Sequence, residues 1–195
     1  MGTFLALLAF AFVNCVTPGP NNVLLWASGA EFGLSRTVRH IVGTALGIGL
    51  MALAAAAGLA ALVTAVPGLA VAMKLVGSIY LLVLAWRIAG AGGFTRGEIV
   101  RPFGVLQAAA FQALNPKGWI FALGAVTTFR PPELPALAGS IVVAATMMAM
   151  VLPTATLWAA AGGALSRLLT SERRRRVVSV GLAALVAATV VSVWV

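Results

Sequence analysis

Two groups of asparagine and proline residues stand inside long apolar segments of the chain. The first group consists of Asn14 and the run Thr17-Pro18-Gly19-Pro20-Asn21-Asn22, and the second is Asn115-Pro116-Lys117. A proline inside a helix removes a backbone hydrogen bond and clashes with the preceding turn, so each group predicts an interrupted helix. In lipid, the freed backbone groups must be satisfied by protein, water or a ligand. Both groups are therefore candidate binding residues.

An interrupted helix offers partial charges of both signs to a small solute. The N–H groups that begin its second half carry partial positive charge and favour a carboxylate. The carbonyl groups that end its first half suit an ammonium group. Because an amino acid carries both charges, two opposed interruptions can hold one zwitterion, with its carboxylate bound by N–H groups and by Lys117. Four side chains are expected to orient the solute: Asn14, Asn21, Asn22 and Asn115.

Several charged or titratable side chains lie in or near the apolar segments. Lys117 lies near the middle of its segment, where a charge is costly and usually functional. Snorkelling to the surface is the alternative, and it is the favoured interpretation for Lys74, near the end of its segment. His40, the only histidine, is either a proton relay or a simple interfacial residue, since histidine titrates near neutral pH. Glu31 is a similar candidate for a gate or proton site.

The composition indicates an integral membrane protein. Hydrophobic residues make up 62% of the 195 residues, charged residues only 9%, and the mean hydropathy is +1.07. A soluble domain carries roughly 25% charged residues, and soluble monomers rarely expose large apolar patches. The apolar runs are continuous, whereas the strands of a membrane barrel alternate apolar and polar residues. The expected fold class is therefore all-α, with transmembrane helices.

The apolar runs predict about six transmembrane helices, because about 20 apolar residues cross the hydrocarbon core. The spans are Thr3–Ala30, Ile41–Val66, Leu69–Trp86, Phe103–Phe129, Leu134–Leu165, which is expected to kink at Pro153, and Val177–Val195. Three spans precede the middle loop and three follow it. A single transmembrane domain, 1–195, would thus hold two inverted three-helix repeats, roughly 1–92 and 99–195. Paired interruptions at corresponding places, here Pro18 and Pro116, point to a transporter binding site.

The distribution of basic residues predicts the orientation. The net charge of +9 does not indicate a nucleic-acid partner, because no segment is polar enough to form a solvated basic domain. Instead, arginines concentrate in the loops after the first, third and fifth spans. The positive-inside rule places these loops in the cytoplasm and both termini outside. The arginines are Arg36, Arg39, Arg87, Arg96, Arg101, Arg167 and the run Arg173-Arg174-Arg175-Arg176, against Arg130 on the other side.

An ordered series of short motifs resembles the lysine exporter family, also called the homoserine/threonine efflux family of translocators. The motifs are Thr17-Pro18-Gly19-Pro20-Asn21-Asn22, Ser28-Gly29-Ala30 with Gly33 and Arg36, His40 with Gly43 and Gly47, Lys74-Leu75 with Gly77 and Tyr80-Leu81, and Phe111 with Asn115-Pro116-Lys117. The last two spans match the family only in character. The resemblance implies a secondary-active exporter of amino acids or related small metabolites, multi-pass in the bacterial inner (plasma) membrane. It does not identify the substrate.

Other classes of protein fit the sequence less well. An exporter of a metal or other small ion would need clustered carboxylates, or Cys and His clusters, and the chain has one Cys, one His and no Asp. A membrane enzyme would need a nucleophile with a base, and no catalytic residue, metal or cofactor is expected. A scaffold or accessory subunit without transport remains open, although it has no need of paired helix breaks.

The expected partners are an amino-acid substrate and the lipid bilayer. A homo-oligomer is left open. The pair Gly43 and Gly47 allows close helix approach, for which packing inside the chain is favoured over a dimer contact.

Overall fold

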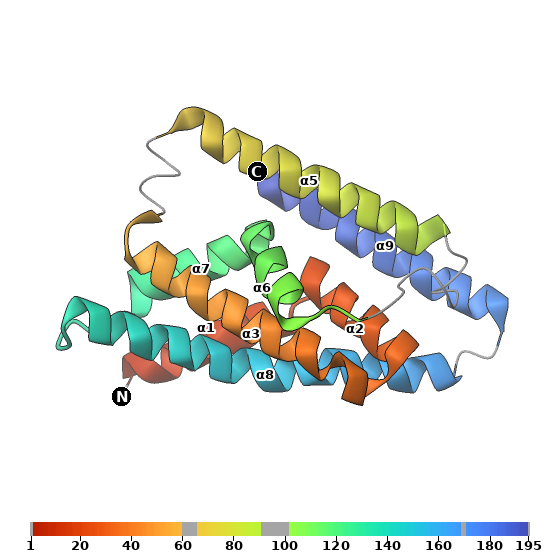
Figure 1. Ribbon diagram of the computed structural model, residues 1–195, viewed down its shortest axis with the longest axis horizontal. Helices are drawn as coiled ribbons and strands as arrows, with labels where there is room; N and C mark the ends of the chain where they lie inside the picture. Colours follow the sequence, from red (N-terminus) through yellow and green to blue (C-terminus); the bar gives the residue numbers. More distant parts are fainter. Residues whose placement is uncertain (1, 60–65, 91–101, 169–170, 195) are drawn as a thin grey trace.

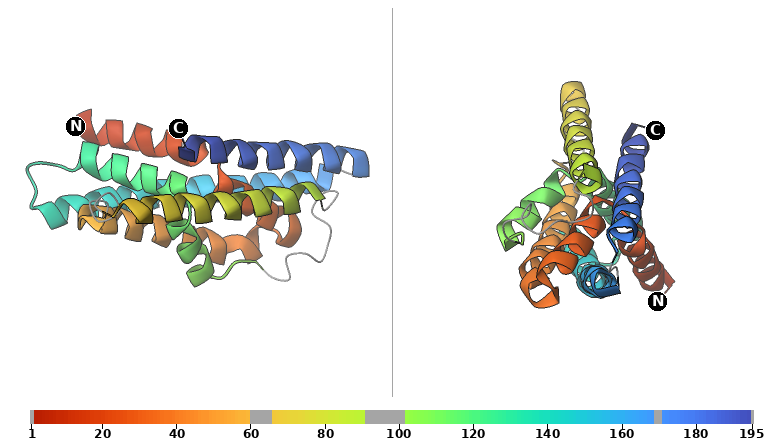
Figure 2. Two further views of the ribbon diagram at one scale, coloured as in Figure 1. Left: turned by 90° about the horizontal axis from the view of Figure 1, so that it is seen from above. Right: turned by 90° about the vertical axis from the view of Figure 1, so that its right-hand side faces the viewer.

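The protein is described here by a computed structural model of residues 2–59, 66–90, 102–168 and 171–194, and every regular element in these ranges is a helix (Figure 1). The helices are α1 (Gly2–Val16), α2 (Pro20–Phe32), α3 (Leu34–Ala56), α5 (Pro67–Gly90), α6 (Val105–Ala113), α7 (Pro116–Phe129), α8 (Ala136–Leu168) and α9 (Glu172–Trp194). The long helices α3, α5, α8 and α9 run roughly along the longest axis (Figure 2). The all-α prediction is confirmed.

The described helices include membrane spans. Leu34–Ala56 and Ala136–Leu165 are each long and apolar enough to cross a membrane, and α1 with α2 adds a third span if the bent pair counts as one. Large apolar side chains such as Trp86, Leu106 and Leu137 are exposed on the outside of the bundle. An outer surface of this kind suits contact with lipid, since soluble monomers rarely display it.

Both predicted helix interruptions are present. The first separates α1 from α2, whose axes differ by 59°, and the second separates α6 from α7. Each second half begins with a proline at its first position, where the missing N–H is tolerated because it would lack a helical partner anyway. The corresponding prolines are Pro20 and Pro116, whereas Pro18 lies in the non-helical link before α2.

Several helix bounds differ from the predicted spans, which were limited by charged residues. Helix α3 begins at Leu34 instead of Ile41, and α9 begins at Glu172 instead of Val177, so arginines occupy their first turns. A helix can extend past the hydrocarbon, because long basic side chains reach water while the backbone stays hydrogen-bonded. Helix α8 continues through Pro153. Arg96, Arg101, the 60–65 end of the second span, Val195 and the boundaries near 92 and 99 lie outside the described residues.

Helices α3 and α8 form the centre of the bundle and pack on each other. Helices α1 and α2 pack on α8, and helices α6 and α7 pack on α3. Glycines bring α2 and α8 into backbone contact, since a Cβ on Gly29 would overlap the carbonyl oxygen of Ala159, and one on Gly162 would overlap that of Trp26. Small residues let membrane helices approach this closely.

Gly43 and Gly47 serve the same purpose between α3 and α6. A Cβ on Gly43 would overlap the carbonyl oxygen of Val105, and one on Gly47 would lie 2.9 Å from Cα of Ala109. The favoured interpretation, close packing inside the chain, is confirmed for this pair.

Helices α5 and α9 form a pair beside the rest of the bundle (Figure 1). Their shared apolar cluster includes Leu81 and Val186, and it also takes in Val23 of α2. At the end of α9, Nε1 of Trp194 donates a hydrogen bond to Oγ of Ser78 over 2.9 Å. The exposed Lys74 has its Nζ 5.6 Å from the ring centre of Trp194, in keeping with the snorkelling interpretation.

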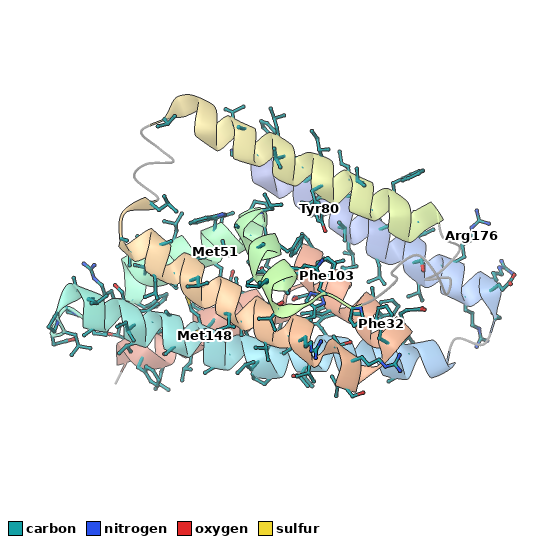
Figure 3. The ribbon with its side chains drawn as sticks, in the orientation of Figure 1. Phe32, Met51, Tyr80, Phe103, Met148 and Arg176 are labelled. Atoms are coloured by element: carbon teal, nitrogen blue, oxygen red, sulfur yellow. The ribbon has the colours of Figure 1, made fainter. Side chains whose placement is uncertain are left out.

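The α5–α9 pair meets the bundle close to the second helix break. Tyr80 lies on the side of α5 that faces α6 (Figure 3), and its ring centre is 5.2 Å from that of Phe111. A Cβ on Gly77 would lie 3.2 Å from the carbonyl oxygen of Leu114 and 3.7 Å from Cδ of Pro116. Helix α5 therefore rests on the link between α6 and α7.

Candidate functional site

The two helix breaks lie next to each other and line one cavity of about 50 Å³. Thr17, Pro18 and Pro116 belong to the breaks but not to the cavity wall, and Glu31 and His40 lie elsewhere. The remaining predicted residues are all in the wall: Asn14, Gly19, Pro20, Asn21, Asn22, Asn115 and Lys117. The sequence groups are thus brought together from opposite halves of the chain.

A chain of buried hydrogen bonds joins the two breaks. Oδ1 of Asn21 accepts from Nε2 of Gln112 over 2.7 Å and from the hydroxyl of Thr44 over 3.3 Å. Oε1 of Gln112 in turn accepts from Nδ2 of Asn115 over 3.1 Å. Because Gln112 donates to one asparagine and accepts from the other, it fixes the direction in which both amides point.

Asn115 leaves one acceptor open in the cavity wall. Its Oδ1 is buried and has no hydrogen-bond partner among the described residues. A buried acceptor without a partner costs about 1–3 kcal/mol, so this oxygen keeps an unused capacity to accept a hydrogen bond. Asn21, whose Oδ1 is already used, keeps its Nδ2 as a donor.

The helix starts at the two breaks are uncapped. Gly19 precedes α2 and Asn115 precedes α7, and neither position has a side-chain cap. The first helical bonds run from Val23 to the Gly19 carbonyl and from Trp119 to the Asn115 carbonyl. The earlier N–H groups therefore have no helical or side-chain capping partner, and they lie at the positive ends of two helices. They belong to Asn21, Asn22, Lys117 and Gly118.

Lys117 crosses from one break to the other. Its Nζ donates to the carbonyl oxygen of Thr17 over 2.6 Å and lies 3.5 Å from that of Pro18. Its aliphatic stem passes over Gly19, where an added Cβ would be 2.9 Å from Cδ of the lysine. The ammonium group thus sits at the carbonyl end of α1.

The other polar residues of the first break bond to α1 itself. Nδ2 of Asn22 donates to the carbonyls of Cys15 and Thr17, each over 2.9 Å, and Nδ2 of Asn14 donates to the Phe10 carbonyl over 2.9 Å. The Thr17 hydroxyl donates to the carbonyl of Val13. The two bonds from Asn22 satisfy carbonyls at the break that the interruption would otherwise leave unpaired, whereas the carbonyls of Phe10 and Val13 also have partners within the helix.

His40 and Glu31 lie away from the cavity. His40 is 1% exposed, and neither ring nitrogen has a partner among the described residues. Its ring centre lies 5.1 Å from that of Phe103, in the segment just before α6. Glu31 is half-buried near the end of α2. His40 is thus a buried residue packed against Phe103, and its role as a proton relay stays a prediction.

Sequence reasoning missed Thr44 and Gln112 as site residues. Both are buried and both bond to Asn21. A signal was available for Gln112, because a polar amide inside an apolar span close to Asn115 is costly in lipid. Thr44 gave no such signal, because threonine often bonds to its own helix. Within the described residues, no three or more His, Cys, Asp or Glu side chains are grouped to hold a metal ion.

Uncapped helix starts and buried amides around a cavity within an apolar helical bundle define the class of membrane transporters. The family model for LysE type translocators matches residues 12–193. The chain belongs to this family, as its motifs predicted, and it is a translocator and not an enzyme. No solved structure shows significant similarity to it.

Curated relatives carry a common name. The cysteine/O-acetylserine efflux protein of Klebsiella pneumoniae is 32% identical over 127 residues, which cover 65% of either chain. Its counterpart in Salmonella typhimurium is 29% identical over 133 residues, or 68% of either chain. The one in Escherichia coli O1:K1 / APEC is 28% identical over 171 residues, or 87% of either chain. The match thus spans just under two thirds of the Klebsiella protein's length.

Proposed function

We propose that this translocator is a secondary-active exporter of small amino acids, of the kind named for its relatives, across the bacterial inner membrane. The open Oδ1 of Asn115, in the same cavity wall as two uncapped helix starts, is the observation that carries the proposal. An amino acid can pair with both features, since its ammonium group donates hydrogen bonds to an oxygen such as Oδ1 and its carboxylate accepts them from N–H groups.

The solute's carboxylate is bound by the first N–H groups of α2 and α7, where helix dipoles favour a negative charge. Its ammonium group is bound by Oδ1 of Asn115. This placement differs from the expectation that carbonyls at the end of α1 hold the ammonium, because Lys117 and Asn22 already bond to the Thr17 carbonyl. Asn14 and Asn22 stabilise the first break, and Asn21 and Asn115 orient the solute.

The protein would span the membrane six times as two inverted repeats, roughly 1–92 and 99–195, with both termini outside. The packing supports this arrangement. In the two repeats, α1, α2, α3 and α5 correspond to α6, α7, α8 and α9. The packing of α1 and α2 on α8 then has its counterpart in that of α6 and α7 on α3, and the contact of α2 with α9 has its counterpart in that of α7 with α5. In such transporters the site lies at the repeat interface, near the middle of the bilayer.

Glu31 and His40 would act as gating or proton-relay residues outside the cavity. His40 supports this role by its position, buried beside Phe103 and without a hydrogen-bond partner among the described residues. Its replacement by phenylalanine removes no hydrogen bond within the described residues. The amount of inserted protein should therefore stay unchanged in His40→Phe, whereas export should fall because the titratable ring is lost.

The proposed function is tested with purified protein in vesicles loaded with radiolabelled cysteine or O-acetylserine. Asn21→Leu and Asn115→Leu should abolish efflux while both variants still insert. Gln107→Leu is the matched control, because this exposed amide on α6 lies outside the cavity and its one bond within the described residues is accepted from the Gly104 N–H. Efflux that persists in both asparagine variants would remove the proposed site, and wild-type vesicles that release no amino acid would remove the function.

A further inference from the structure

The carbonyl end of α1 is a cation site that the protein fills with its own ammonium group. The Thr17 carbonyl accepts from Lys117 over 2.6 Å, and the Pro18 carbonyl lies 3.5 Å from the same nitrogen. Both carbonyls directly follow the last turn of α1, and the carbonyl end of a helix carries partial negative charge and attracts a cation. An ammonium group from a solute would seek the same oxygens.

The position of Lys117 is not the one that its own helix favours. It lies in the first turn of α7, where the helix dipole is unfavourable to a positive charge. Its side chain reaches away to the opposite end of another helix, and Gly19 leaves room for its stem. The half-buried Lys117 is held in place by the unfavourable dipole of its own helix and by the 2.6 Å charge-assisted bond to the Thr17 carbonyl.

We propose that Lys117 is a tethered cation that excludes amino acids with positively charged side chains from the cavity. The inference rests on the proposed export of amino acids. A neutral amino acid needs one ammonium acceptor, and Oδ1 of Asn115 supplies it. A second ammonium finds the carbonyls of α1 occupied and the charge of Lys117 nearby. No Asp or Glu stands in the described cavity wall to compensate for that second charge.

The test uses two competitors of nearly equal shape. The side chain of norvaline ends in a methyl group, and that of 2,4-diaminobutyrate ends in an ammonium group at the same position. Purified protein in vesicles is assayed at neutral pH with the membrane potential clamped to zero, so that voltage does not act on the charged competitor. The measured quantity is the ratio of their inhibition constants against a labelled neutral amino acid. Wild-type protein should favour norvaline at least tenfold, the lower end expected for an uncompensated charge-assisted bond.

Lys117→Met should reduce this ratio by roughly tenfold or more, because the α1 carbonyls become free to accept the second ammonium. Lys117→Arg keeps a cation at the position and should keep the preference. Lys74→Met is the matched control, since Lys74 is exposed on α5 beside Trp194 and should leave the ratio unchanged. The ratio is informative even if the variant transports slowly.

Two results would overturn the inference and leave the proposed function intact. One is a wild-type protein that accepts diaminobutyrate as well as norvaline, which needs no variant and so decides the question even if Lys117→Met fails to fold. The other is an unchanged ratio in a well-folded Lys117→Met. A wild-type protein that transports no amino acid at all would instead refute the proposed function, and the inference with it.

Discussion

Replacing Gln112 should weaken solute binding, because it removes the bonds that orient Asn21 and Asn115 while leaving the other residues of the cavity wall unchanged. It holds Asn21 through a 2.7 Å bond and Asn115 through a 3.1 Å bond, and it is buried. Gln112→Leu keeps a similar size and removes both bonds. Asn21 retains its bond from Thr44, but Nδ2 of Asn115 loses its acceptor.

The magnitude follows from these two losses. The bond to Asn21 is worth about 0.5–1.5 kcal/mol, and a buried donor left unpaired on Asn115 costs about 1–3 kcal/mol. Together they amount to roughly 2–4 kcal/mol, of which 2 kcal/mol corresponds to about a 30-fold change in an equilibrium constant. Without Gln112, binding itself must fix the direction of the Asn115 amide, so up to about 2 kcal/mol is lost from binding and affinity should fall by as much as about 30-fold.

The assay is the concentration dependence of amino-acid efflux from vesicles, with the amount of inserted protein measured in parallel. Gln107→Leu, on the exposed side of the same helix, should behave like wild type. Affinity within twofold of wild type in a normally inserted Gln112→Leu would refute the role of this network.

Three further outcomes are expected. Gly29→Ala forces a Cβ into the backbone of α8 and should destabilise the protein by at least about 2 kcal/mol in thermal melts, whereas Gly181→Ala, with nothing within 4 Å, should stabilise it slightly. Trp194→Phe and Ser78→Ala should each cost about 1 kcal/mol, and combining them should add little, since both remove the same bond. Cys15 is the only cysteine and lines the cavity, so saturating substrate should slow its labelling by a small maleimide; equal rates would place the substrate elsewhere.

The sequence predicted the interrupted helices because proline and the bilayer leave few alternatives. It did not show which proline begins α2, since Pro18 and Pro20 can each occupy a first helical position, and the choice depends on where α1 ends. The start of α3 was placed too late because Arg36 and Arg39 were assigned to a loop. Charged residues limit the hydrocarbon span and not the helix.

Contacts between distant segments were beyond the reach of sequence reasoning. Lys117 was predicted to be functional, but its partner, the Thr17 carbonyl, depends on how two breaks from opposite halves approach each other. The Gln112 bond to Asn21 has the same character. The family resemblance added the class of function, which the match to residues 12–193 then confirmed. It did not indicate which polar atoms of the cavity lack a hydrogen-bond partner.

Gly77 makes the α6–α7 link sensitive to movement of a helix that lines no part of the cavity. With only glycine at this position, α5 lies against the Leu114 carbonyl and the Pro116 ring, and α5 is joined to α9 by the Ser78 bond. If α5 and α9 move together along the bundle, Gly77 no longer lies against the Leu114 carbonyl. Any movement of the α5–α9 pair during transport would therefore act directly on the link between α6 and α7.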